Sequence, residues 1–116
     1  TLFGRRRVIP EIASTMPQLR AAGERMAINM PIQGTAADIM KLAMIKVYDF
    51  LKKNYSSDDV RMLLQIHDEL VFEVKQNLVS QLAPQLKEIM ENIHTFDVPV
   101  VVDMKSGANW QDMKKL

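Results

Sequence analysis

The amino-acid sequence predicts an α+β domain in which a small antiparallel sheet is backed by long helices. Three observations lead to this class. Apolar residues recur at three- and four-residue spacing in several segments, a period-two apolar pattern flanks residues 67–69, and residues 98–104 form a β-branched run. With 116 residues the chain can bury one modest core. We therefore expect one small domain whose sheet combines a β-hairpin with a C-terminal strand.

The composition excludes several classes of protein. The chain has 47% apolar and 25% charged residues with a formal net charge of +1, so its overall charge does not point to nucleic acid. The absence of cysteine excludes a disulfide framework and a thiolate zinc site. No apolar run approaches the ~18–20 residues of a membrane span, and we expect neither a signal peptide nor a membrane partner.

Charge is less evenly distributed along the chain. Residues 1–30 hold five arginines against two glutamates, which fits either a phosphate-facing surface or a solvated arginine cluster. Residues 1–12 are expected to be extended with a bend, and Pro10 and Pro17 to bracket a connector. The first residue is Thr rather than Met, which is compatible with a chain cut from a longer one.

Two helices are predicted in the first half of the chain. An apolar stripe through Leu19, Ala22, Met26 and Met30 predicts the first, over 17–30. Pro31 and Gly34 are expected to break or kink it.

The second predicted helix covers about 36–53 and has a wide apolar stripe. Thr35 is its expected N-cap, and Asp38 three residues later nearly completes a capping box. Residues 54–59 are expected to form the loop that follows.

The segment VRMLLQIHDELVFEV, residues 60–74, predicts a β-hairpin. Apolar residues alternate on both sides of its centre: Met62, Leu64, Ile66, Leu70, Phe72 and Val74. Two-residue hairpin turns favour Asn-Gly or Asp-Gly, because both central residues then adopt positive φ. His-Asp is not a pair that turn chemistry selects, so another requirement has selected it.

The last third predicts a helix over 79–93, with Pro84 in its first turns or at a kink. The run VPVVVDM, residues 98–104, predicts a strand. A tail containing Gly107 and Trp110 closes the chain.

Asp68 and Glu69 are the candidate metal ligands. A hairpin tip keeps neighbouring carboxylates solvated while their strands are rigid, and hard cations such as Mg²⁺ prefer carboxylate oxygens. One carboxylate would then be a direct ligand and the other an auxiliary. The alternative is a surface turn that is polar only because turns are polar. One Asp and one Glu are too few for a two-metal site, and no second acidic cluster has an obvious spacing.

Four blocks together resemble DNA polymerase family A, the bacterial DNA polymerase I family. They are TLFGRRRVIPEI, ERMAINMPIQGTAADIMKLAM, HDELVFEV and VPVVVDMKSGANW, in the family's order and over nearly the whole chain. The resemblance implies that residues 1–116 are the C-terminal part of a polymerase palm, with the upstream palm, fingers and thumb absent.

The resemblance also implies roles for the hairpin residues. Asp68 would be one of two metal-binding aspartates, Glu69 an auxiliary carboxylate, and His67 would lie near the primer terminus unless it is simply a packed turn histidine. Two Mg²⁺ ions would serve the full site, of which only part of the ligand set is present. The implied partners are primer–template DNA, deoxynucleoside triphosphates and the missing upstream polymerase, in the bacterial cytoplasm.

Arg25, Asn29 and Gln33 are spaced four apart, which places the first two on one helix face and the third at the expected break. They are donors suited to the minor-groove acceptors that nearly all base pairs share, and the family's matching residues contact DNA there. The alternative is an ordinary polar helix face.

Arg5, Arg6 and Arg7 could grip a template or primer backbone, since arginine binds phosphate in a bidentate manner. An internal salt bridge is equally open for one of them.

Other functions remain to be weighed. The main alternative to a polymerase segment is a non-catalytic DNA-binding module derived from the same palm. If the chain is a polymerase segment, we expect it to be inactive on its own. A metal-dependent nuclease would need more ligands than Asp68 and Glu69.

Overall fold

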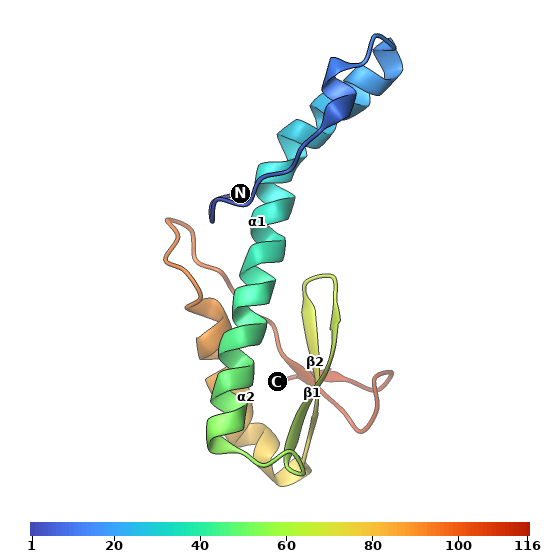
Figure 1. Cartoon of the computed structure of the whole chain (residues 1–116). Helices are drawn as coiled ribbons and strands as arrows, with labels where there is room; N and C mark the ends of the chain where they lie inside the picture. Colours follow the sequence, from blue (N-terminus) through green and yellow to red (C-terminus); the bar gives the residue numbers. More distant parts are fainter. The chain divides into compact units, whose positions relative to one another are not determined.

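The computed structural model describes all 116 residues and divides into two compact units, residues 1–41 and 42–116. It confirms the α+β class, with helices and two small antiparallel sheets. No helix combines the length and the apolar character needed to cross a membrane. Along the chain the elements are η1 (Pro10–Ala13), α1 (Pro17–Asn54), β1 (Val60–Ile66), β2 (Glu69–Val74), η2 (Gln76–Leu78), α2 (Val79–Glu91), β3 (Lys105–Ser106) and β4 (Lys114–Lys115) (Figure 1).

Helix α1 runs unbroken through Pro31, so the predicted division into helices over 17–30 and 36–53 is wrong (Figure 1). Pro31 has no N–H and leaves the carbonyl of Ala27 without its usual helical partner, which costs about 3 kcal/mol. The helix has 38 residues. Long stretches on either side of the proline keep their hydrogen bonds, and one missing bond does not end the helix.

Thr35 and Gly34 have roles other than the predicted ones. Thr35 is not an N-cap: its hydroxyl donates to the carbonyl of Pro31 one turn earlier in the same helix. A Cβ on Gly34 would lie 2.7 Å from Cγ2 of Thr1 and 2.8 Å from Cε of Met30. Gly34 therefore makes room for the N-terminal segment rather than breaking the helix.

The N-terminal segment is extended with a bend, as predicted, up to Ile9, whereas residues 10–12 belong to the 3₁₀ helix η1 and are not extended. Its bend is a turn in which the Gly4 amide donates to the Thr1 carbonyl at 3.0 Å, with a φ of 83° at Gly4. The segment then forms η1, which packs closely on α1. A Cβ on Gly23 would lie 2.8 Å from the backbone nitrogen of Ile12, so no larger residue fits there without a backbone shift.

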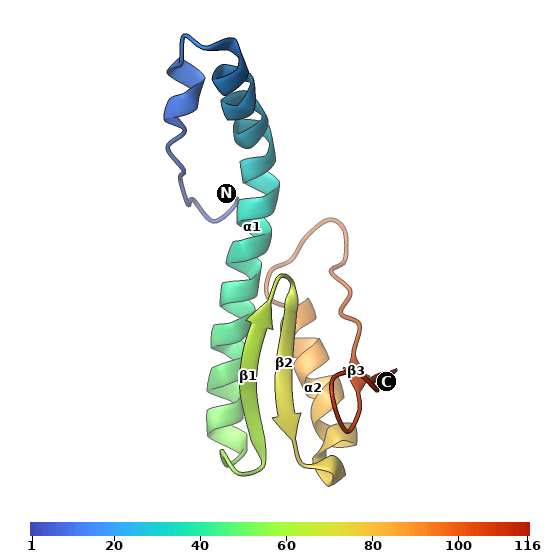
Figure 2. The ribbon, with the colours of Figure 1, turned by 90° about the vertical axis from the view of Figure 1, so that its right-hand side faces the viewer.

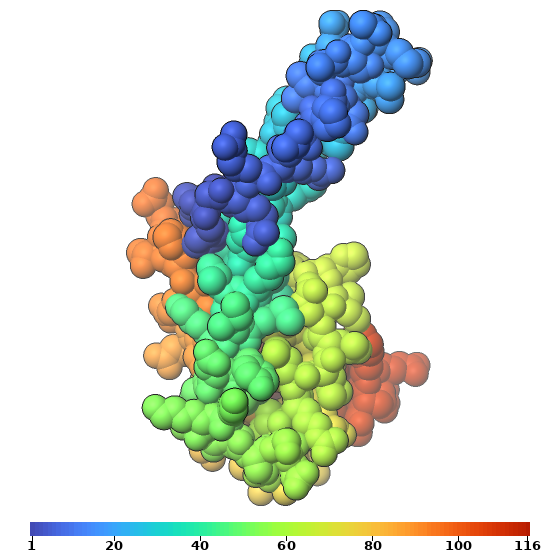
Figure 3. Space-filling model, in the orientation of Figure 1, coloured from blue at the N-terminus to red at the C-terminus, as the bar shows by residue number.

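The core of the second unit joins three elements. Its buried residues come from α1, β1 and α2: Val47, Leu51, Val60, Leu82 and Leu86. Figures 2 and 3 show the C-terminal half of α1, the hairpin and α2 packed together, with side chains filling the space between the ribbons. Tyr55 reaches this core from the end of α1, and its hydroxyl donates to Oε1 of Gln85 at 2.8 Å.

The hairpin forms where the sequence predicts it, but its register contains an irregularity. Val60 faces Val74 and Met62 faces Phe72, whereas Leu64 faces Val71, which leaves Leu63 as a bulge residue. Paired residues lie on the same face of a sheet, and the bulge shifts the alternation by one residue. The predicted common face for Met62, Leu64 and Ile66 is therefore wrong: only Met62 shares the face of Phe72 that packs on the core.

The open end of the hairpin is fixed by Asp59 and Lys75. The Lys75 amide donates to the Asp59 carbonyl at 2.9 Å, and Lys75 Nζ lies 2.6 Å from Asp59 Oδ1. The Ser56 hydroxyl donates to Asp59 Oδ2 at 2.8 Å. The Lys75 hydrogen bond lowers the pKa of Asp59 and, in return, Asp59 raises the pKa of Lys75. These contacts hold the register at the end opposite the loop.

The C-terminal third matches the prediction only in part. Helix α2 ends at Glu91, two residues before the predicted end, and carries Pro84 in its second turn. Residues 98–104 are not a strand: they have no sheet partner, and Pro99 lacks an amide proton. At their end the Met104 carbonyl accepts a hydrogen bond from the Leu116 amide at 3.0 Å, next to the β3–β4 pair. The strand after them, β3, pairs with β4 in a sheet of its own rather than extending the hairpin.

We expect Leu82→Ala to lower the free energy of unfolding of the second unit by about 2–5 kcal/mol, because it leaves a cavity in the core. Leu82 is only 1% exposed. Urea denaturation followed by circular dichroism measures the effect. Val98→Ala is the matched control: Val98 is 73% exposed, and its truncation should change stability by less than about 0.5 kcal/mol. Equal effects of the two variants would contradict the assigned core.

Candidate functional site

The trio His67, Asp68 and Glu69 lies at the closed end of the hairpin. His67 and Asp68 form a two-residue loop, and Glu69 is the first residue of β2, paired with Ile66. All three residues are exposed, so the two carboxylates keep their hydration and no burial cost arises. Neither carboxylate forms an ion pair within the chain. The hairpin therefore presents two free, neighbouring carboxylates at its tip.

His67 has a φ of 53°, the only positive φ among the non-glycine residues of the chain. Left-handed backbone is unfavourable for residues with a Cβ, at roughly 1–2 kcal/mol, and Gly or Asn usually occupies such positions. The cost is tolerated here because the strands on both sides fix the loop. The observation agrees with the sequence argument that turn chemistry did not select His67.

The two carboxylates fit part of a magnesium site. Carboxylate oxygens at an exposed and rigid position are what Mg²⁺ takes from a protein, with water and phosphate as its remaining ligands. No group of three or more His, Cys, Asp or Glu side chains gathers anywhere in the chain. Asp68 and Glu69 thus supply at most a partial ligand set.

The donor row Arg25, Asn29 and Gln33 lies in the first unit, entirely within α1. Because the helix continues through Pro31, Gln33 is on the same face as the other two and not at a break. All three side chains are exposed and make no hydrogen bond that competes with a ligand. Ile28 and Ile32, which are 73% and 77% exposed, lie beside them. The face thus alternates donors with apolar side chains.

The three consecutive arginines differ in their contacts. Nε of Arg5 lies 2.6 Å from Oδ1 of Asp38, so Arg5 makes the internal salt bridge that the sequence left open. An Arg7 terminal nitrogen lies 3.7 Å from the sulfur of Met26. Arg6 is exposed and makes no ion pair. Arg6 and Arg7 therefore carry charges with no counter-charge in the chain, and Arg5 keeps its two terminal nitrogens available.

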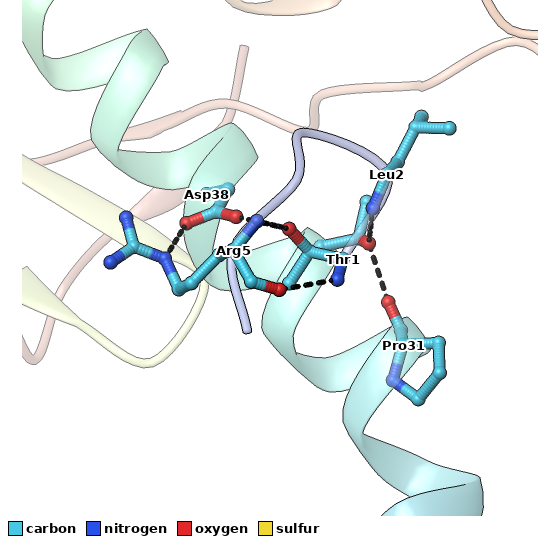
Figure 4. A network of polar contacts seen from close by, with 6 residues as sticks. Thr1, Leu2, Arg5, Pro31 and Asp38 are labelled. Carbon is cyan, nitrogen blue, oxygen red and sulfur yellow. Dashed lines mark hydrogen bonds and ion pairs between the residues drawn. The ribbon is translucent and has the colours of Figure 1, made fainter. Parts of the chain in front are cut away.

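Asp38, which its spacing from Thr35 predicts to nearly complete a capping box, is instead the centre of a polar network (Figure 4). Asp38 is only 5% exposed and is the one buried charged residue of the chain. Besides Arg5 it accepts a hydrogen bond from the Thr1 hydroxyl at 2.8 Å, and that hydroxyl accepts the Arg5 amide at 3.0 Å. The hydrogen bond from Arg5, then that from Thr1, lowers the pKa of Asp38 against the opposing effect of burial.

This network fixes the N-terminal segment on α1. The Leu2 amide adds a hydrogen bond to the Thr35 hydroxyl at 3.0 Å, so residues 1–5 are held at two points of the helix (Figure 4). Local spacing predicts Thr35 as an N-cap and Asp38 as part of a capping box, and it does not indicate their contacts with the N-terminal segment. Thr1, Leu2 and Arg5 lie more than 30 residues away along the chain, and no local pattern indicates them.

Comparison with known proteins gives a consistent result. The family model described as DNA polymerase family A matches residues 1–112. Among curated proteins, the chain is 50% identical over 112 residues to DNA polymerase I of Pseudomonas aeruginosa, covering 97% of the chain and 12% of that protein. It is 47% identical over 115 residues to the thermostable DNA polymerase I of Thermus filiformis, covering 99% of the chain and 13% of that protein. The chain thus spans about an eighth of the length of these relatives.

A solved structure agrees with this similarity. It is the POL domain of Pol1 from M. smegmatis in a complex with DNA primer-template and dNTP. The match has a TM-score of 0.76 and 47% sequence identity, and it covers 85% of this chain and 17% of that one.

We expect the first unit to lose, in acid, the stabilisation that the Arg5–Asp38 pair provides at neutral pH. The pKa of Asp38 is lower in the folded chain than in the unfolded one, so the pair stabilises the fold above about pH 4. This contribution is lost as the pH falls through the lowered value. Urea unfolding between pH 3 and 7 should show Asp38→Asn less stable than the native chain at pH 7, with the difference vanishing in acid.

Asp97→Asn is the control for this experiment, since Asp97 is exposed and makes no ion pair or hydrogen bond. The difference in the free energy of unfolding between Asp97→Asn and the native chain should not shrink in acid as that of Asp38→Asn does. A difference for Asp38→Asn that is constant from pH 3 to 7 would show that the carboxylate charge is not what stabilises the segment.

Proposed function

The chain belongs to DNA polymerase family A, and we propose that it is part of a DNA-directed DNA polymerase that transfers deoxynucleotides to a primer 3′ hydroxyl. The observation that carries the proposal is the His-Asp-Glu tip: two free carboxylates on a rigid, exposed hairpin. The solved POL domain that the chain resembles was captured with DNA primer-template and dNTP, which supports the same substrates here.

DNA polymerases of family A generally use divalent metal ions. We propose that Asp68 is the direct metal ligand and that Glu69 is the auxiliary carboxylate. Bound Mg²⁺ would activate the primer hydroxyl and stabilise the leaving pyrophosphate. The hairpin's own contribution is position. The core below it and the Asp59–Lys75 pair at its base fix where the two carboxylates stand. The further metal ligands and the triphosphate-binding residues would come from the upstream polymerase.

His67 is assigned to the primer terminus. Its imidazole is exposed at the tip, and its left-handed backbone indicates that the residue is kept for its side chain rather than for the turn. A histidine there can donate a hydrogen bond to a sugar or phosphate oxygen.

The donor row is assigned to the minor groove of the primer–template duplex. A polymerase must accept all four base pairs, and purine N3 and pyrimidine O2 are acceptors that all of them present. Arg25, Asn29 and Gln33 are donors at one-turn spacing on an uninterrupted helix. The exposed Ile28 and Ile32 beside them suit the apolar faces of the sugars.

The arginines of the N-terminal segment are assigned to the DNA backbone. Arg6 and Arg7 have uncompensated charges, and the terminal nitrogens of Arg5 remain free for a phosphate while its Nε binds Asp38. We also assign the work of the parent protein to the bacterial cytoplasm, which the similarity to bacterial DNA polymerase I supports.

A non-catalytic DNA-binding module is the second candidate. One observation favours it. The chain contains all the residues proposed to contact DNA, both the donor row and the arginines, whereas no three candidate metal ligands lie close enough together to hold an ion. The two candidates differ in their metal dependence, because a binding module holds DNA equally well when a chelator is present.

We expect the isolated chain not to extend a primer, because one aspartate cannot hold two metal ions and no group of three or more candidate ligands is present. An end-labelled primed template with all four deoxynucleotides and Mg²⁺, resolved on a gel, measures this. Asp68→Ala is run beside the native chain. Extension by the native chain that is lost in Asp68→Ala would contradict the incomplete site.

The metal itself can be tested directly on the chain. Mn²⁺ at low concentration should broaden the amide resonances of the hairpin loop, and Asp68→Asn should remove most of this effect. Asp97→Asn, an equal loss of charge at an exposed position, should leave it unchanged.

DNA binding should separate into two kinds of contact. Arg6→Gln or Arg7→Gln should each lower the slope of log affinity against log salt by roughly 0.9, because one phosphate contact is lost. Asn29→Ala should weaken binding about five-fold with the slope unchanged, as expected for one uncharged hydrogen bond. Fluorescence anisotropy with a primed duplex at several salt concentrations measures both effects.

The control for the DNA experiment is Lys53→Gln, which removes an exposed positive charge at the far end of α1. It should change neither affinity nor slope appreciably. Arginine variants that behave like Lys53→Gln would argue against a phosphate contact by the N-terminal segment.

A further inference from the structure

The hairpin loop can adopt two forms that differ in one peptide plane. A type I′ turn has positive φ at both central residues, and a type II′ turn has it at the first only. The two forms interconvert by a flip of the peptide between the central residues. In this chain His67 has a positive φ and Asp68 does not. The loop therefore has the backbone signature of type II′, and the direction of the His67 carbonyl distinguishes it from the alternative.

One side chain contacts that carbonyl. Nε2 of Gln65 donates a hydrogen bond to the backbone oxygen of His67 at 2.5 Å. Gln65 is the next-to-last residue of β1 and is paired with Leu70 across the hairpin, so its backbone is fixed by the ladder. A flip of the 67–68 peptide would turn the His67 oxygen away and break this bond.

The sequence of the loop does not select one form by itself. His-Asp contains no glycine, and Asp tolerates left-handed backbone better than most residues. The type I′ form, with a positive φ at Asp68, is therefore accessible to the loop. The form present is the one that satisfies Gln65.

We propose that Gln65 is a positioning residue that fixes the 67–68 peptide plane and thereby the direction in which Asp68 presents its carboxylate. A change of sign in φ at Asp68 rotates its Cα–Cβ bond relative to the strands. Reacting groups tolerate misplacement of only about 1 Å before rates fall steeply. What Asp68 does with its carboxylate rests on the proposed function, whereas the hold of Gln65 on the loop does not.

Solution NMR of the isotope-labelled chain tests the proposal through the backbone of Asp68. A strong intraresidue HN–Hα Overhauser effect marks positive φ, so the native chain should show it at His67 and not at Asp68. Gln65→Met keeps the size of the side chain and removes the donor. The share of the form with positive φ at Asp68 should then rise roughly two- to ten-fold, the range expected for one hydrogen bond.

Three further variants complete the design. Gln65→Glu places an acceptor where the donor was and should act like Gln65→Met. Gln65→Lys restores a donor on a long side chain and should keep Asp68 in its native form. Gln76→Met is the matched control, since Gln76 is exposed at the other end of the hairpin and makes no side-chain hydrogen bond. Cross-strand contacts between Val60 and Val74 report that each variant keeps its hairpin.

The outcomes separate this proposal from the proposed function. An unchanged Asp68 in both Gln65→Met and Gln65→Glu, or a positive φ at Asp68 in the native chain, overturns the role of Gln65. A change at Asp68 that is confined to the variants without a donor supports it. Mn²⁺ broadening of the loop is then measured on the same samples. Should the native loop show none, the metal role of Asp68 fails while the positioning by Gln65 stands; weaker broadening in Gln65→Met links the two.

Discussion

The packing of the hairpin on two helices is the constraint on which the candidate site depends. A two-stranded hairpin alone is marginally stable in water. Here Val60 at its base is buried against Val47 of α1 and Leu82 of α2, and Met62, Phe72 and Val74 add to this contact. The strands are therefore rigid up to a loop that projects into solvent. Burial stops short of the loop, which is why His67, Asp68 and Glu69 can be both fixed and hydrated.

A comparable division holds in the first unit, where one buried carboxylate fixes a surface that is otherwise charged and exposed. The hydrogen bonds that Thr1 and Arg5 donate to the Asp38 carboxylate offset the free-energy cost of burying it. The segment that it holds carries Arg6 and Arg7, whose charges have no partner within the chain. In the first unit the polar network of Asp38 positions side chains that face solvent, and in the second unit the apolar core does so. The candidate functional residues are among these exposed side chains.

The sequence predicted those features that depend on neighbours along the chain. The hairpin, its two-residue loop and helix α2 follow from local periodicity. The errors have more than one physical origin, and in the case of Gly34 a distant contact outweighs a local preference. Pro31 and Gly34 look like helix breakers, yet α1 continues, and Gly34 accommodates Thr1 instead. The bulge at Leu63 moves Leu64 and Ile66 to the other face, and no pattern of apolar residues announces an unpaired residue.

Residues 98–104 show most clearly what a period-two pattern can and cannot specify. The alternation is present: Val100, Val102 and Met104 are partly buried while Val101 and Asp103 are exposed, and Met104 packs on the core. The ladder is not: the Val102 amide donates to a carboxylate oxygen of Glu91, and backbone bonding to a neighbouring segment begins at Met104, whose carbonyl accepts from the Leu116 amide next to the β3–β4 pair. Alternation arises from having one face against a core, and hydrogen-bonded pairing needs a second segment with free backbone groups. A β-branched run therefore predicts which side chains of an extended segment face the core. It does not predict which other segment of the chain, if any, will form hydrogen bonds with it.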